Sequence, residues 1–226
     1  ETGQKTGPGD GPNQPAGKGK GAMPGRVVWA WDPKATNENC INTFDLYKPE
    51  NTSQGVVSRM VAESVRKLGG KKVLSEAWDA LFRSFNMEKT GQNRGYAEGE
   101  KIFIKINQGT ANAKLRPDDI SNGFYIPQRM TESEDAKRGY SGTCETYPNV
   151  VLEILRELVN VAGIEQKNIS VGDPISHIFG HNYDIWAAEF PDVVYVDRMS
   201  EKWGRTLTKP TEKELLFYSD KKQADK

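Results

Sequence analysis

Short apolar runs alternate with longer amphipathic stretches along this chain of 226 residues. Four of the runs end in Asp32, Asn107, Asp173 and Asp197. Apolar runs separated by helix-patterned stretches are typical of parallel strands. The pattern predicts an α/β fold with an open, mostly parallel sheet and helices on both faces, a three-layer Rossmann-like arrangement. The predicted strands are 26–31, 101–106, 168–172 and 193–196, with a further candidate strand at 214–218.

The stretches between the runs have helical periodicity and recognisable ends. Gly69 and Gly70 follow one apolar stripe, as glycines at helix C-termini commonly do. Pro148 stands at the favoured first position of another helix, which ends at Gly163. The predicted helices are 54–68, 75–85, 148–161 and 183–189.

Residues 1–24 are rich in Gly, Pro and Lys, with too few apolar side chains to offset the entropy of ordering. We expect a flexible linker there, followed by residues 25–226 as either a single α/β domain or the N-terminal part of a longer one. A chain that begins at Glu1 without methionine resembles a spacer after a removed signal or lipid anchor. Export to the periplasm or cell surface is therefore expected, although an expression-vector remnant has a similar composition.

The chain is formally neutral, with 31 Lys and Arg against 31 Asp and Glu. This balance does not suggest a nucleic-acid partner. No apolar run approaches the roughly 20 residues of a transmembrane helix, so none is expected. Export would allow Cys40 and Cys144 to form a disulfide, but both are equally compatible with free thiols, and the sequence does not decide between the two.

The carboxyl ends of parallel strands share one edge of the sheet, and ligands bind in the crevice outside that edge. We therefore expect Asp32, Lys105, Asn107, Asp173 and Asp197 to line a ligand site there. Lys105 would hold an anionic or carboxylate group, because an unpaired ammonium on a buried strand is costly. The alternative is an edge strand whose lysine points to water.

Thr146 is also a candidate ligand-binding residue. It precedes a helix N-terminus, whose free N–H groups can donate hydrogen bonds to an anion. His177 and His181 are four residues apart and would bind a metal if they faced one way on a helix. Pro174 and Gly180 favour a loop there instead, and with it two ordinary loop histidines.

Each aspartate also has a plain structural interpretation. Asp32 precedes a proline and is typical of a turn start. Asp173 would cap the turn that follows it. Asp197 and Arg198 would form a surface ion pair of little energetic value.

Several motifs resemble the bacterial domain-of-unknown-function family 362. They are a G-x-K-x-x-x-K-x-N strand, a helix that ends in A-G and a strand that ends in G-D, over roughly residues 25–200. The resemblance implies an α/β fold, frequent export in bacteria and, in some members, an iron–sulfur module. This chain lacks the ferredoxin cysteines, so we do not expect a cluster. The matching residues are Gly99, Lys101, Lys105, Asn107, Ala162, Gly163, Gly172 and Asp173.

Together these features predict a domain that binds a small anionic or metal-bridged ligand at the carboxyl edge of its sheet. The alternative is a non-catalytic exported module that contacts another exported protein through the long polar segment 108–145. Neither the motifs nor the composition specify a cofactor or a reaction.

Overall fold

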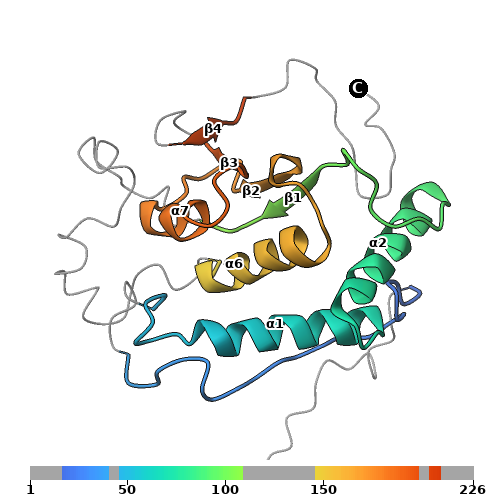
Figure 1. Cartoon of the computed structure of the whole chain (residues 1–226), viewed down its shortest axis with the longest axis horizontal. Coiled ribbons are helices and arrows are strands. Elements are labelled where there is room, and N and C mark those ends of the chain that lie inside the picture. The colour runs from blue at the N-terminus through green and yellow to red at the C-terminus, as the bar shows by residue number, and fades with distance from the viewer. Residues whose placement is uncertain (1–16, 41–45, 109–145, 199–203, 210–226) are drawn as a thin grey trace, which may run out of the picture. The chain divides into compact units, whose positions relative to one another are not determined.

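The computed structural model describes residues 17–40, 46–108, 146–198 and 204–209 (Figure 1). The sequence predicts a single domain from residue 25 onward, whereas the structure groups the chain into two compact units. The first unit, which we call the helical unit, consists of residues 1–31 and 60–97. The second, the sheet unit, consists of residues 32–59 and 98–226. The division falls inside α1 (Gln54–Gly69).

The sheet unit is built on four strands in the order β1-β2-β3-β4, and all neighbouring strands are parallel. The predicted α/β class with an open parallel sheet is thus confirmed. Ile104 of β1 pairs with Val171 of β2, which in turn pairs with Tyr195 of β3. The strands are β1 (Ile102–Lys105), β2 (Ile169–Gly172), β3 (Val194–Asp197) and β4 (Arg205–Leu207).

Helices connect the first three strands. α6 (Pro148–Arg156) begins at the predicted proline and continues into a π-helical turn (Glu157–Val161), which the sequence pattern did not predict. A short 3₁₀ turn (Gln166–Asn168) leads to β2, and α7 (Gly180–Ala187) leads to β3. α6 and α7 pack against each other (Figure 1), and the buried Trp186 indole donates a hydrogen bond to the Pro148 carbonyl at 2.9 Å.

Glycine allows a close contact between β2 and β3. Gly172 is buried, and a Cβ at this position would collide with the backbone oxygen of Val196 and lie 2.7 Å from its Cβ. Around this contact, the apolar core includes Ile169, Val171 and Tyr195, which are almost completely buried. No larger residue fits at Gly172 unless the two strands move apart.

The helical unit contains the second part of α1 and the whole of α2 (Leu74–Thr90). α1 ends at the predicted glycines: Gly70 has a φ of +65°, the Lys71 N–H donates to the Arg66 carbonyl, and the Gly70 N–H donates to the Lys67 carbonyl. This is the Schellman arrangement, in which a left-handed residue lets two backbone amides satisfy the last carbonyls of a helix.

The predicted strand 26–31 is wrong, because the structure assigns no strand to these residues. Val27, Trp29 and Trp31 alternate as in a strand, but they are 90%, 81% and 68% exposed. An alternating pattern forms a strand only if a neighbour supplies the backbone hydrogen bonds, and no described segment pairs with this one. Asp32 therefore does not end a strand of the sheet.

Other predictions differ from the structure or fall outside it. β4 was not predicted, because three residues with little apolar content give no periodic signal. The candidate strand 214–218, the segment 109–145 and Cys144 lie outside the described residues. Both alternatives for Cys40 and Cys144, a disulfide or two free thiols, therefore stay open.

Across the described residues, no helix has both the length and the apolar character required to span a membrane.

The substitution Gly172→Ala should lower the free energy of unfolding by about 1–3 kcal/mol, because the added methyl group forces β2 away from β3. Gly55→Ala is the matched control: Gly55 lies in α1 with open space around it, and alanine there should be neutral or stabilise by up to about 1 kcal/mol. Urea denaturation of both variants measures the difference. Equal stability of the two variants would contradict the close approach at Gly172.

Candidate functional site

The parallel register brings several predicted residues to one edge of the sheet. Lys105 is paired with Gly172, and Gly172 is paired with Val196. The residues that follow these positions, Asn107, Asp173 and Asp197, therefore lie at the carboxyl edge. We call this group of strand-end residues, with Lys105 and Thr146, the carboxyl-edge site.

An ion pair joins the ends of β1 and β2. The Lys105 ammonium lies 3.3 Å from Asp173 Oδ1, and the side chains are 46% and 5% exposed. Lys105 Nζ also donates to Asn107 Oδ1 at 3.0 Å and to the Ile106 carbonyl. β1 is an edge strand among the described residues, as the alternative interpretation held, but its lysine is paired as well as exposed.

Asp173 is buried, and backbone amides hold its carboxylate. Oδ2 accepts a hydrogen bond from the Gln108 N–H at 3.1 Å, and Oδ1 accepts one from the Ile175 N–H at 3.2 Å. The second contact is the predicted turn cap. Burial alone would raise the pKa of Asp173, but these two N–H groups and the Lys105 ammonium together hold it below its ordinary value.

Thr146 ties the chain after β1 to the start of α6. Its hydroxyl accepts a hydrogen bond from the Asn107 N–H at 2.7 Å, and its own N–H donates to the Asn107 carbonyl at 2.9 Å. The α6 N-cap is Tyr147, which makes no side-chain capping bond. Thr146 thus positions Asn107 at the site and does not cap the helix.

Gln108 is a buried residue that the sequence analysis missed. It is completely buried, its Nε2 donates to the Asn107 carbonyl at 3.1 Å, and its Oε1 accepts from Asn182 Nδ2 at 3.2 Å. Its position directly after Asn107, at a strand end, was the one available signal. Gln108 connects the carboxyl-edge site to α7.

Asp197 is completely buried, and its partners include three described residues. Its Oδ1 lies 3.1 Å from His177 Nδ1, and its Oδ2 accepts the Ile178 N–H at 2.8 Å and lies 3.6 Å from Arg205 Nε. The predicted surface pair with Arg198 is therefore wrong. Arg198 follows the end of β3, and its Nη1 donates to the Ile175 carbonyl at 3.3 Å.

Arg205 of β4 was also missed. It is buried, its Nη2 donates to the Ile178 carbonyl at 3.1 Å, and its guanidinium lies 4.7 Å from the centre of the Tyr183 ring. An aspartate that orients a histidine is a known arrangement in acid–base catalysis. Here the same aspartate also binds Ile178 and Arg205, so the cluster holds the segment after β2 against β3 and β4.

The two histidines have different surroundings. His177 contacts Asp197, whereas the His181 ring stacks on Tyr47 and Phe179, with centroid distances of 4.8 and 5.5 Å. Within the part of the chain that the structure describes, no group of three His, Cys, Asp or Glu residues could hold a metal ion. The paired-histidine metal site therefore has no support from these residues.

Asp32 begins a turn, as the proline that follows it predicts. Its Oδ1 accepts the Lys34 N–H at 2.9 Å, and its Oδ2 lies 3.9 Å from an Arg59 guanidinium nitrogen. These contacts account for the carboxylate without a ligand.

The chain was compared with protein families, with curated proteins and with solved structures, and none of the three comparisons gave a match. The resemblance to domain-of-unknown-function family 362 therefore stays a prediction.

The substitution Asp197→Ala should lower the free energy of unfolding by about 3–5 kcal/mol, because it leaves the buried Arg205 without its carboxylate. The exposed Asp192 on the preceding segment is the control, and Asp192→Ala should change stability by no more than about 0.5 kcal/mol. Chemical denaturation at neutral pH measures both. A small loss for Asp197→Ala would show that the cluster does not hold this region together.

The substitution Asp173→Asn should cost about 1–2 kcal/mol at neutral pH, since a charged acceptor is lost. The pKa of Asp173 is lowered in the folded state, so its contribution is fully present above the ordinary value of 3.8 and is lost as the pH falls below it. Denaturation of both proteins from neutral pH down to about pH 2 should show the difference shrinking in acid. A constant difference across this range would refute the lowered pKa.

Proposed function

We propose that the sheet unit binds a small anionic ligand at the carboxyl-edge site, with Lys105 as the charged contact. Asn107 and Thr146 orient the ligand by hydrogen bonds, and Asp173 positions the lysine. The observation that carries the proposal is a half-exposed ammonium held at the carboxyl end of a parallel sheet by a buried carboxylate. Ligands of open α/β sheets bind at this edge.

The hydrogen bonds of Lys105 define how a ligand would enter. An ammonium has three donors, and those of Lys105 go to Ile106, Asn107 and Asp173. Asn107 is exposed and its amide can rotate, so its Oδ1 is the acceptor that an incoming anion replaces. The freed Asn107 amide then presents its N–H₂ group to the same anion.

Asp173 stays in place during this exchange. Two backbone N–H groups fix its carboxylate, whereas the lysine has a long flexible stem. The carboxylate reduces the positive charge that the ligand meets, so we expect modest affinity. Binding replaces one hydrogen bond of the ammonium with another, so this exchange alone adds little to the binding free energy. The choice between ligands therefore depends on their shape and charge.

The metal-bridged form of the ligand gains no support from the described residues, which contain no suitable cluster. The alternative function, an interaction module using residues 108–145, concerns residues that are almost all outside the described part of the chain. Export to the periplasm or cell surface and the resemblance to domain-of-unknown-function family 362 belong to this proposal as expectations.

The test compares Lys105→Ala with Lys101→Ala. Lys101 lies just before the opposite end of β1 and donates to Asn168 Oδ1 at 2.7 Å, so the control removes the same charge away from the site. Titration calorimetry with phosphate, sulfate, acetate and citrate at constant ionic strength should find one anion that binds wild type and Lys101→Ala. Lys105→Ala should bind it at least about tenfold more weakly, since a charge-assisted hydrogen bond is lost.

Two outcomes would refute the proposal. One is equal binding by Lys105→Ala and Lys101→Ala, which would place the anion elsewhere. The other is the absence of binding by any of the four anions together with unchanged thermal stability, because a ligand of the native state must raise the midpoint.

A further inference from the structure

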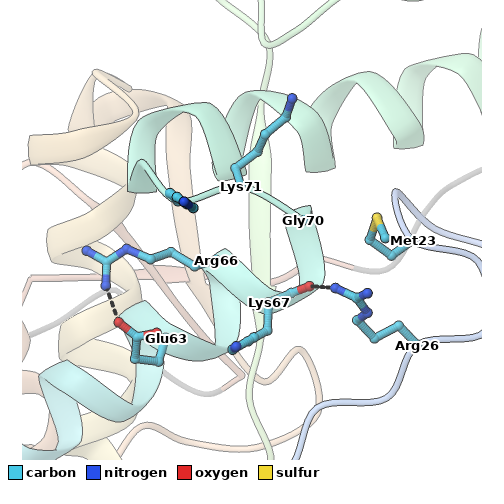
Figure 2. A pocket seen from close by; sticks show the side chains of 8 residues that line it. Met23, Arg26, Glu63, Arg66, Lys67, Gly70 and Lys71 are labelled. Atoms are coloured by element: carbon cyan, nitrogen blue, oxygen red, sulfur yellow. Dashed lines mark hydrogen bonds and ion pairs between the residues drawn. The ribbon is translucent and has the colours of Figure 1, made fainter.

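A concentration of positive charge lies in the helical unit, around the turn between α1 and α2. It lines a pocket of about 500 Å³, which we call the basic pocket (Figure 2). We infer that the basic pocket binds a phosphate-type oxyanion that carries more than one negative charge. Its lining residues are Met23, Arg26, Glu63, Arg66, Lys67, Gly70, Lys71 and Lys72.

The pocket is built by the end of α1 and by the segment that precedes it in sequence. Gly70 takes the left-handed conformation, and a Cβ there would lie 2.6 Å from Met23 Sδ, so the methionine packs directly on the glycine. The Arg26 guanidinium donates to the Lys67 carbonyl at 2.7 Å (Figure 2). Residues from the Gly-rich start of the chain thus form one wall of the pocket.

Protein groups already engage two of the five cations. Arg66 is paired with Glu63 at 2.5 Å, and Glu63 is the one carboxylate in the lining. Arg26 meets the carbonyl end of α1, where the helix macrodipole carries about half a negative charge. Both guanidinium groups are thus engaged, although the buried Arg66 Nε has no hydrogen-bond partner among the described residues.

Lys71 and Lys72 have no comparable compensation, and Lys67 has only the macrodipole at the last turn of α1. Lys67, Lys71 and Lys72 are exposed, and none forms a side-chain hydrogen bond or ion pair with another described residue. Like charges around one concavity repel each other, and an anion in the pocket would relieve this repulsion. The lining therefore carries more positive charge than is needed to balance Glu63 and the negative end of the α1 macrodipole.

The excess charge extends beyond the pocket. The helical unit contains eleven Lys and Arg against six Asp and Glu, whereas the sheet unit contains twenty against twenty-five. The neutral chain thus consists of one unit with a net charge of +5 and one of −5. A net positive unit attracts anions from solution at low ionic strength.

The size of the pocket selects the kind of anion. About 500 Å³ is within the range of small-molecule sites, roughly 300–1,000 Å³, and exceeds the needs of one phosphate. A diphosphate or a phosphorylated small molecule can contact lysines on separate parts of the wall, which a monovalent anion cannot do. The same phosphate chemistry is also present on the headgroups of anionic lipids.

The experiment is titration calorimetry of the full chain with inorganic pyrophosphate at low ionic strength. The double variant Lys71→Ala/Lys72→Ala should bind at least about tenfold more weakly than wild type. The matched control, Lys18→Ala/Lys89→Ala, removes two exposed lysines of the same unit that do not line the pocket and should bind as wild type does. Both double variants retain Lys105, so a loss of affinity confined to Lys71→Ala/Lys72→Ala separates this site from the carboxyl-edge site.

Vesicles distinguish the two sources of phosphate. A lipid headgroup is the ligand if wild type sediments with phosphatidylglycerol vesicles but not with phosphatidylcholine vesicles, and does not bind pyrophosphate. In that case Lys71→Ala/Lys72→Ala should abolish the sedimentation. Pyrophosphate binding that depends on Lys71 and Lys72 identifies a soluble ligand. Equal effects of the two double variants, or a heat signal that sodium chloride of the same ionic strength reproduces, would overturn the inference. So would the absence of binding to both pyrophosphate and anionic vesicles.

Discussion

The buried carboxylate of Asp197 joins parts of the sheet unit that are distant in sequence. It lies at the end of β3 and contacts His177, the Ile178 N–H and the Arg205 guanidinium of β4. A carboxylate without water is tolerated only with partners of this kind, so the fold around it has little freedom to rearrange. The segment from Asp173 to Ile178 is therefore held at both ends, and the carboxyl-edge site inherits its geometry from this constraint.

Lysines serve two different purposes in this protein. Lys105 is held by a buried carboxylate, which fixes the position of the ammonium and limits its net charge. Lys71 and Lys72 follow the end of α1 and have no described acidic partner, so no ion pair with a described residue reduces their charge. The first arrangement suits a small ligand recognised by geometry. The second suits an anion recognised mainly by its charge.

Sequence reasoning succeeded where local patterns determine structure. The strands at 168–172 and 193–196 and the helix ends at Gly70 and Gly163 follow from apolar periodicity and glycine conformation, so they were predictable. The parallel register pairs Lys105 with Gly172 and so brings it next to Asp173. Asp197 was misjudged because its partners lie 19 or 20 residues before it and 8 residues after it, at positions that only the fold brings together. The strand at 26–31 failed for the same reason, since its pattern cannot reveal that no neighbour pairs with it.

The opposite charges of the two units also affect how copies of the protein behave toward one another. A chain with no net charge lacks the long-range repulsion that keeps proteins apart in solution. The positive unit of one copy attracts the negative unit of another, and this attraction is strongest when few ions screen it. Concentrated solutions of this protein should therefore be more turbid in dilute buffer and become clear on addition of salt, a salting-in behaviour that the overall composition alone conceals.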